Sequence, residues 1–391
     1  MTDAAARFGL RRMTARDALQ SHRVASPLEL LFDLVFVVAV SQASSTLHDL
    51  ISEGRIGAGV LTYLMVFFAV WWAWMNFTWF ASAFDTDDWL YRTLAIVQMG
   101  GVLVLAAGVR DAMLLSDYTV ITLGYVVMRL AMVAQWLRVA ASDSASRPTA
   151  VRMAAGIGAV QVLWVARAAV LGDEAPAWTF GLLVIAELAV PVWAELRGRT
   201  QWHPHHIAER FGLFTLLLLG ESLLASANAL IDAIAEGEHV AELLWLAGSG
   251  LFITAAIWWI YFAREQYDGL GELRGGFTFG YVHYVIFAAV GAVSSGVEVE
   301  IDEVTGHTEI SDAAAGLALT APLAVFLVSA WALLLRRRVA RWVSVVLVAG
   351  SVLVALAGLL AVGEFVVAAL VMTGVVVALE VDAARGATRR A

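Results

Sequence analysis

The sequence predicts an all-α protein that crosses a membrane many times, and three observations support this. Of the 391 residues, 61% are hydrophobic and 15% are charged, whereas a soluble domain is about half apolar and about a quarter charged. The apolar residues fall in runs that are long enough to cross a bilayer core as helices. Short polar segments separate these runs, and none is long enough to form a soluble domain. Cys is absent, which excludes disulfides, thiolate metal sites and cysteine nucleophiles.

The first apolar run follows a basic N-terminal segment, residues 1–26, which carries Arg but no apolar core. We therefore expect this segment to be cytoplasmic and to contain no cleavable signal peptide. The run Pro27–Leu47 has about 21 residues and would span about 31 Å as a helix. It contains Glu29 and Asp33, whose spacing of four places both carboxylates on one helix face. Carboxylates in a membrane helix usually face a bundle interior, a partner charge or a water path.

Twelve runs are expected to form membrane helices, and the distribution of Arg gives their orientation. Arg is concentrated in alternate connections, which by the positive-inside rule places both termini in the cytoplasm and requires an even number of spans. The segment Glu298–Asp312, by contrast, is acidic and is expected to be an outside loop. The expected helices are residues 27–48, 57–82, 90–109, 118–140, 149–171, 176–196, 207–231, 241–263, 277–297, 312–335, 339–361 and 364–381.

An internal repeat divides these helices into two sets of six. The segment Glu29–Phe36 aligns with Glu209–Leu216, and the aromatic cluster at Trp71–Met75 aligns with Trp258–Phe262. Six helices per half is an even number, so both halves enter the membrane with the same polarity and form parallel repeats. We therefore predict a first repeat at 27–196, a cytoplasmic linker at 197–206, a second repeat at 207–381 and a cytoplasmic tail at 382–391.

Three aspartates, Asp85, Asp87 and Asp88, occupy a connection that is expected to be cytoplasmic. In one interpretation Asp85, Thr86 or Asp87 caps the third helix, and the others pair with arginines at the surface. In the other, the group forms an ion-entry site. With Glu209 and Arg210, these aspartates would line the cytoplasmic mouth of a polar path.

Four stretches resemble the signature segments of the bacterial low temperature requirement A (LtrA) family. They are ELLFDLVFVVAVSQ at Glu29–Gln42, WAWMNFTWFASAFDTDD at Trp72–Asp88, ERFGLFTLLLLGES at Glu209–Ser222 and YVHYVIFAAVG at Tyr281–Gly291. The resemblance implies a multi-pass protein of the bacterial inner membrane, and it supplies no catalytic roles. The family's typical positions correspond here to Glu29, Phe32, Asp33, Trp72, Trp74, Asp85, Asp87, Asp88, Glu209, Arg210, Gly220, Glu221, Ser222 and His283.

The first helix also resembles, more weakly, that of the lysosomal two-repeat potassium channels and their bacterial relatives. The shared features are Phe32 and Asp33 on a first helix and the two-times-six arrangement. Here the serine of that family's Phe-Ser-Asp motif is missing, and the second repeat lacks the aspartate. As an analogy, the resemblance implies a cation channel lined by the first helix of each repeat.

Several ionisable residues within the predicted helices are candidates for a polar path. Glu29 and Asp33 either pair with Arg210, Arg92 or N-terminal arginines, or line a path for a cation or proton. Glu221, followed by Ser222, would lie past the membrane midplane, where a carboxylate is either neutral or paired.

Arg129 and His283 complete this set. Arg129 needs a counterion, for which Glu221, Glu187 and Asp33 are the options, and it forms either a structural pair or part of a substrate site. His283 is either a hydrogen-bonding group between helices or a proton relay.

We predict a transporter of a small solute or ion whose path is lined by Glu29, Asp33, Arg129, Glu221, Ser222 and His283. The alternatives are a lipid-binding or membrane-adaptation protein without transport activity, the cation channel, and an intramembrane enzyme that acts on a lipid; we favour a non-enzyme. We expect membrane lipids and a small solute or ion as partners, with a homodimer as an option. We expect no metal, since Cys is absent and Pro204 breaks the helical spacing in His203-Pro204-His205-His206. We expect no nucleic acid, since the basic loops are too short to bind it, and no cofactor.

Overall fold

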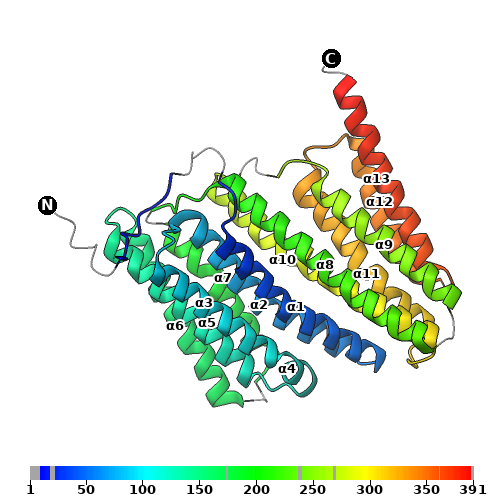
Figure 1. Cartoon of the computed structure of the whole chain (residues 1–391), viewed down its shortest axis with the longest axis horizontal. Helices are drawn as coiled ribbons and strands as arrows, with labels where there is room; N and C mark the ends of the chain where they lie inside the picture. The colour runs from blue at the N-terminus through cyan, green and yellow to red at the C-terminus, as the bar shows by residue number, and fades with distance from the viewer. Residues whose placement is uncertain are drawn as a thin grey trace. The chain divides into compact units, whose positions relative to one another are not determined.

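The computed structural model describes residues 9–17, 23–172, 175–196, 198–236, 240–266, 270–360 and 362–388. Parts of the predicted N-terminal segment, linker and tail (1–8, 18–22, 197 and 389–391) lie outside the described residues. Throughout the described ranges, the regular elements are helices (Figure 1). They are α1 (Pro27–Ser52), α2 (Ile56–Phe84), α3 (Trp89–Ala107), α4 (Val109–Leu115), α5 (Thr119–Ser142), α6 (Arg147–Leu171), α7 (Ala177–Glu195), α8 (Pro204–Glu236), α9 (Val240–Phe262), α10 (Leu273–Thr305), α11 (Asp312–Ala330), the π-helical turn η3 (Trp331–Leu335), α12 (Arg341–Ala357) and α13 (Glu364–Thr388).

Each predicted run overlaps a helix, although the run 90–109 reaches the start of α4, the run 312–335 covers both α11 and η3, and α12 is shorter than the predicted run 339–361. Among the described residues, ten helical segments are long and apolar enough to cross a membrane. The chain is therefore a polytopic helical membrane protein. The helix α12 is apolar but shorter, and α8 is not among the ten.

Several predicted helix ends differ from the structure: α8 ends at Glu236 and α13 at Thr388, both beyond the predicted ends, and α12 ends at Ala357, before the predicted end. The helix α10 continues to Thr305, so the first four acids of the expected outer loop, from Glu298 to Glu303, are helical.

The chain forms two compact units, which we describe separately. The first unit comprises Met1–Gln42, Val66–Phe211 and Gly269–Leu273, and the second comprises Ala43–Met65, Gly212–Asp268 and Arg274–Ala391. The division falls inside α1, α2 and α8 and after the first residue of α10, so these helices contribute residues to both units. The six-helix repeat boundary at 197–206 stays a prediction.

In the first unit, α3, α5, α6 and α7 pack as successive neighbours (Figure 1). Two glycines allow α3 and α5 to approach closely. A Cβ on Gly124 would lie 2.5 Å from the carbonyl oxygen of Gly101, and one on Gly101 would lie 2.7 Å from Cγ of Met128. Small residues at such contacts bring helix backbones together, which is the main source of packing energy between membrane helices.

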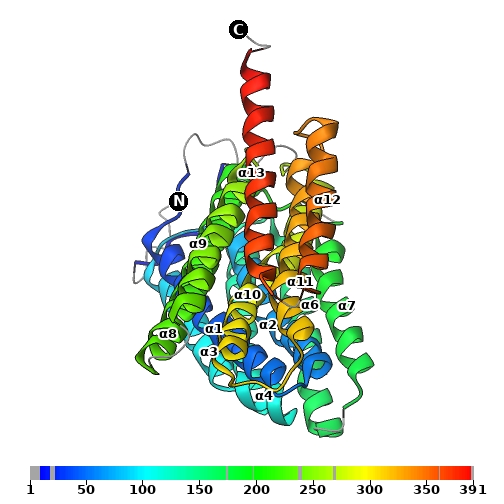
Figure 2. The ribbon, with the colours of Figure 1, turned by 90° about the vertical axis from the view of Figure 1, so that its right-hand side faces the viewer.

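In the second unit, α13 packs against both α9 and α12, and α12 packs against α11 (Figure 2). Pro322 lies inside α11, and the π-helical turn η3 follows directly after that helix. Gly296 of α10 has the same role as the glycines of the first unit, because a Cβ there would lie 2.5 Å from Cα of Leu319.

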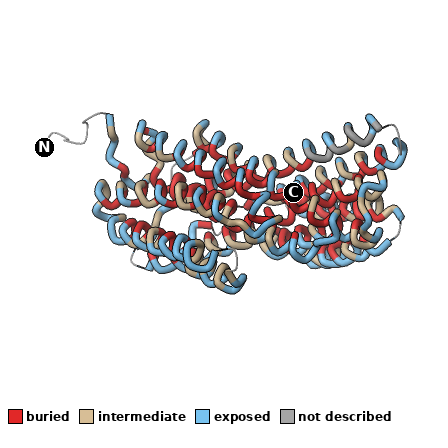
Figure 3. The backbone as a smooth tube through the Cα atoms, turned by 90° about the horizontal axis from the view of Figure 1, so that it is seen from below, coloured by how far each residue is buried: buried red, intermediate tan, exposed pale blue. Residues whose placement is uncertain are grey.

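Buried residues lie on the inner sides of the helices and exposed residues on their outer sides (Figure 3). Many exposed side chains are large and apolar, including Val162 on α6, Ile185 on α7 and Phe252 on α9. In water such a surface would be unfavourable. It is the surface expected of helices that face lipid.

Candidate functional site

The helix α1 begins with a capping box that fixes the side chain of Glu29. Ser26 precedes the helix and Pro27 starts it, where a missing N–H has no cost. The backbone N–H of Ser26 donates to Oε2 of Glu29 at 2.8 Å, and the N–H of Glu29 donates to Oγ of Ser26 at 3.3 Å. This reciprocal pair is the signature of a helix start. It leaves the other carboxylate oxygen of Glu29, Oε1, for contacts within the first unit.

Asp33 lies one turn further along α1 and is completely buried. Its carboxylate forms a bidentate pair with Arg210 of α8, with Nε of Arg210 donating to Oδ2 at 2.8 Å and a second guanidinium N–H donating to Oδ1. The indole N–H of Trp74 on α2 also donates to Oδ1, at 2.7 Å. Because Asp33 accepts three hydrogen bonds in planar, charge-assisted geometry, it is the best-satisfied acid of the cluster.

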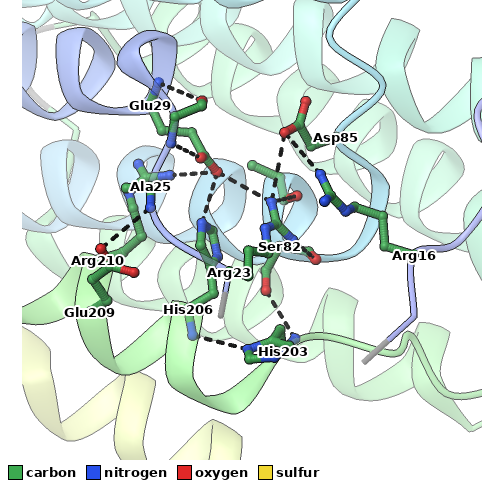
Figure 4. Close-up of polar contacts among 12 residues, drawn as sticks. Arg16, Arg23, Ala25, Glu29, Ser82, Asp85, His203, His206, Glu209 and Arg210 are labelled. Carbon is green, nitrogen blue, oxygen red and sulfur yellow. Dashed lines mark hydrogen bonds and ion pairs between the residues drawn. The ribbon is translucent and has the colours of Figure 1, made fainter. Parts of the chain in front are cut away.

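Glu29 differs from Asp33 because one of its carboxylate oxygens, Oε1, has close basic neighbours but no hydrogen bond. Three cationic or basic groups approach Oε1 of Glu29: a guanidinium nitrogen of Arg210 at 3.1 Å, Nε2 of His206 at 3.2 Å and a guanidinium nitrogen of Arg23 at 3.5 Å (Figure 4). Among the described residues, none of these contacts has hydrogen-bond geometry, and the Oε1 atom of Glu29, both ring nitrogens of His206 and one nitrogen of Arg210 have no hydrogen-bond partner. A buried polar atom without one requires an explanation.

Arg23 extends the cluster to the end of α2. Its guanidinium donates to the carbonyl oxygens of Ser82 and Ala81 and lies 3.8 Å from Oδ2 of Asp85. Asp85 also pairs with Arg16 at 3.3 Å. Burial raises the pKa of Asp85 above its usual value, despite the opposing effect of both arginines, and burial lowers the pKa of Arg23.

The cluster is balanced in charge, with three carboxylates against three guanidiniums, and His206 is placed among them. We call this group the Glu29 cluster; its members are Arg16, Arg23, Glu29, Asp33, Asp85, His206 and Arg210. Glu209 lies beside it and accepts a hydrogen bond from the N–H of Ala25 at 3.4 Å (Figure 4).

The other aspartates of the α2–α3 connection correct one prediction. The cap of α3 is Asp88, not Asp85, Thr86 or Asp87, and it accepts a hydrogen bond from the N–H of Tyr91 at 3.0 Å. Expected capping positions before a helix are uncertain by a residue or two, because several Asp can begin the same turn.

The expected surface pairing of these aspartates is present. Asp87, whose backbone is left-handed (φ 47°), forms an exposed bidentate pair with Arg92 at 2.8 and 2.9 Å. The side chain of Asp88 is buried and pairs with both guanidinium nitrogens of Arg138. Arg92, one of the predicted partners of Glu29 and Asp33, therefore pairs with Asp87 instead. The predicted partner that does contact both Glu29 and Asp33 is Arg210.

Arg129 pairs with Glu187 of α7, one of its three possible counterions, at 2.8 Å. The carboxylate of Glu187 is fully buried and accepts three further hydrogen bonds, from Trp72 at 2.9 Å, Tyr125 at 3.0 Å and Gln161 at 3.0 Å. These four donors come from three helices besides α7, namely α2, α5 and α6. All four would have to be withdrawn to free the carboxylate, which indicates a structural role for this ion pair.

The remaining candidates belong to the second unit. Glu221 is half-exposed, and within the described part of the chain it forms no ion pair, although the carboxylate of Glu298 is near enough to repel it. Ser222 is buried and donates to the carbonyl oxygen of Leu218 at 3.0 Å. His283 is fully buried and contacts the Phe279 carbonyl oxygen through Nδ1 at 2.7 Å and the Tyr261 hydroxyl through Nε2 at 2.9 Å. These contacts suit a histidine that links helices.

Sequence reasoning did not select His206, Arg23 or Glu187 as site residues. For His206 a signal was present: His206 and Arg210 are four residues apart, as are Glu29 and Asp33. A spacing of four places two side chains on the same face of a helix. The two acids on one helix could therefore face the two basic side chains on another. For Glu187 the signal was an acid within an otherwise apolar run.

Comparison with known proteins gives one family and one relative. The profile described as "Bacterial low temperature requirement A protein (LtrA)" matches residues 24–381. The chain is 28% identical over 289 residues to "Uncharacterized protein RA0937" of Rhizobium meliloti (strain 1021), and the match covers 67% of this chain and 67% of that protein. No solved structure matches the chain.

Proposed function

This chain belongs to the bacterial low temperature requirement A (LtrA) family, and from that premise we propose that it transports a small solute or ion across the bacterial cytoplasmic membrane. In this proposal twelve helices cross the membrane, both termini are cytoplasmic, and the Glu29 cluster is the site at which the transported species or a coupled proton binds. A cluster of charged groups inside an apolar helical bundle is costly, and in membrane proteins such groups usually mark a pathway.

The proposal rests on the contacts of Oε1 of Glu29, the carboxylate oxygen that takes no part in the capping box. Arg210, His206 and Arg23 all lie within 3.5 Å of it, yet no aligned hydrogen bond to it is formed from the described residues. A purely structural ion pair gains its stability from good geometry. Oε1 of Glu29 has three nearby basic groups and an aligned hydrogen bond with none of them. This arrangement suits a carboxylate that exchanges one partner for another.

Asp33 and Glu29 would then have different tasks. Asp33 holds Arg210 through two hydrogen bonds and is itself held by Trp74, so it positions the guanidinium. Glu29 is the exchanging group: a proton or cation that binds Oε1 displaces its weaker contacts with His206 and Arg23. A ligand that changes these contacts can shift a conformational equilibrium, because it binds the two arrangements with different affinity. Glu221 and Ser222 of α8 remain predicted members of the path.

The proposal is tested by flux into reconstituted vesicles. A pH-sensitive dye inside the vesicles reports proton entry, and parallel assays use Na⁺ and K⁺ gradients as probes. We expect the wild-type protein to produce flux in at least one assay. Glu29→Gln should abolish that flux because it removes the exchanging charge, and Asp33→Asn should abolish it because it removes the charge that positions Arg210.

Loss of a buried charge can also destabilise the fold, by about 3–5 kcal/mol when the partner stays charged. Glu187→Gln is the matched control, since it breaks an equally buried ion pair, with Arg129, in the same unit. Size-exclusion profiles and thermal unfolding in detergent establish that all three variants are folded. Full flux in both Glu29→Gln and Asp33→Asn, or equal loss in Glu187→Gln, would contradict the assigned roles.

A further inference from the structure

A basic pocket lies in the second unit where α9 ends, α12 begins and α13 approaches its last turns. Its volume is about 740 Å³, within the range of about 300–1,000 Å³ that is common for ligand sites. The charged and aromatic side chains that line it are Arg264, Arg338, Trp342, Asp382 and Arg385. Figure 2 shows α13 between α9 and α12. Neither the predicted path nor the Glu29 cluster includes any of these residues.

Neighbouring groups hold the side chains of Arg264 and Arg385 in place. Arg264 donates to Oδ2 of Asp382 at 3.3 Å and to the carbonyl oxygen of Ala263 at 2.7 Å. The guanidinium of Arg385 lies over the ring of Trp342, 5.4 Å from its centroid. Side chains that are already ordered lose less conformational entropy when a ligand binds.

The charge of the pocket is opposite to that of the whole chain. Three arginines and one aspartate line it, whereas the chain has a formal net charge of −9. Arg336 and Arg337 lie with Arg338 in the connection between η3 and α12, Arg341 begins α12, and all three add to the positive potential. The three lining arginines come from separate segments of the chain, so their convergence is a property of the fold, and the pocket favours an anion.

The chemistry of the site favours a phosphate group. A guanidinium offers a planar set of donors that matches phosphate oxygens, and it is less strongly hydrated than an ammonium group. Apolar surface begins beside these donors. Val345 is one turn beyond Trp342 on α12 and is exposed, as are Val348 and Val352 further along the helix. A ligand with a phosphate head and an apolar tail fits both features.

We propose that this pocket binds the headgroup of an anionic phospholipid, with its phosphate on Arg338 and Arg385 and its acyl chains along α12. Basic pockets between membrane helices at the membrane surface are suited to such lipids. Trp342 lies in the first turn of α12, and an indole is favourable at a membrane interface. The site is separate from the proposed transport site, and either can exist without the other.

Native mass spectrometry of the full-length protein in detergent tests this proposal. The lipid probes are phosphatidylglycerol, which is anionic, and phosphatidylcholine, which carries the same phosphate with a compensating cation. We expect the wild-type protein to retain phosphatidylglycerol over phosphatidylcholine. The double variant Arg338→Gln/Arg385→Gln should bind phosphatidylglycerol at least about tenfold more weakly, since two charge-assisted contacts are lost.

The matched control is Arg336→Gln/Arg337→Gln. It removes the same charge from the same connection, but both side chains are exposed and do not line the pocket. We expect it to retain wild-type affinity. Equal weakening in the two double variants would show general attraction to the basic connection. Equal retention of the two lipids would show that the pocket does not select an anionic headgroup. Either result would overturn the proposal.

Competition with soluble phosphates tests whether the pocket binds a lipid headgroup or a free phosphate compound. Inorganic phosphate and glycerol 3-phosphate are added to the complex with phosphatidylglycerol. We expect neither to displace the lipid, because neither occupies the apolar surface of α12. Displacement, with direct binding of the soluble anion by the wild-type protein but not by Arg338→Gln/Arg385→Gln, would show that the pocket serves a soluble phosphate and would overturn the lipid assignment.

Discussion

At the scale of the residue, the carboxylate of Asp88 joins three parts of the first unit. It caps α3 through Tyr91, pairs with Arg138 of α5 and accepts the backbone N–H of Arg11 at 2.9 Å. Burial alone would raise its pKa, but the hydrogen bond from Arg138 and the two backbone donors outweigh burial and lower the pKa below its usual value. The ionised form is therefore the form that stabilises the folded protein.

The sign of the pH dependence follows from this lowered pKa. The contribution of Asp88 is complete above its pKa in the unfolded chain, about 3.9, and is lost as the pH falls through the lower pKa of the folded protein. We expect Asp88→Asn to lower the unfolding temperature at neutral pH and to differ less from the wild-type protein in acid. Thermal unfolding in detergent between about pH 3 and pH 7 measures both effects.

Asp87→Asn is the control for this measurement. Asp87 forms a comparable bidentate pair with Arg92, but both side chains are exposed to solvent. Exposed pairs contribute about 0–1 kcal/mol, and Asn tolerates the left-handed backbone at this position. If Asp87→Asn and Asp88→Asn have the same effect at every pH, the buried pair with Arg138 is not the cause.

At the scale of the element, the packing of α3 on α5 depends on one face of α3. Gly100 and Gly101 are adjacent, but they face different surroundings. A Cβ on Gly101 would lie 2.7 Å from Met128 and 2.9 Å from the carbonyl oxygen of Gly124, whereas a Cβ on Gly100 would meet nothing within 4 Å. The same substitution at these two positions separates helix propensity from helix packing.

We expect Gly101→Ala to destabilise the protein by about 1–3 kcal/mol, because the extra methyl group overpacks the contact with α5. Gly100→Ala should be neutral or stabilising by up to about 1 kcal/mol, since Ala favours the helix. Reversible unfolding in mixed detergent measures the two free energies. Equal stability of the two variants would show that α3 and α5 do not pack this closely.

At the scale of the whole molecule, the sequence predicts the side of the membrane on which each connection lies. The connection between η3 and α12 is rich in Arg and contains Arg337, whereas Glu309 lies in the acidic connection before α11. The positive-inside rule places the first in the cytoplasm and the second outside. The absence of Cys from the chain allows a direct test with single introduced cysteines.

We expect Glu309→Cys to react with a membrane-impermeant maleimide in intact cells, because its side chain is exposed and the positive-inside rule predicts that its connection lies outside. Arg337→Cys, which is also exposed, should react only after the cells are permeabilised. The unsubstituted protein is the control for background labelling. Labelling of both positions from the same side would contradict the predicted topology.

The sequence alone determined the class of the protein and the location of its helices. The length and apolar content of each hydrophobic run, and the spacing between runs, can be read from neighbouring residues in the sequence. A bilayer then requires each backbone polar group of a run to bond within its own helix. Each predicted run therefore overlaps a helix, while local details such as the end of α10 and the cap of α3 differ from the prediction. Glu29 and Asp33 were selected because a carboxylate is conspicuous in an apolar run.

Only the tertiary structure decided which charges meet. Asp33 and Arg210 are 177 residues apart, and Arg129 has Glu187 as its partner among three options. Helical periodicity gives the face on which a side chain lies, but not the neighbouring helix or the register at which it packs. That register is set by close contacts such as Gly101 on Gly124. The same reason explains why the three arginines of the basic pocket could not be grouped from the sequence.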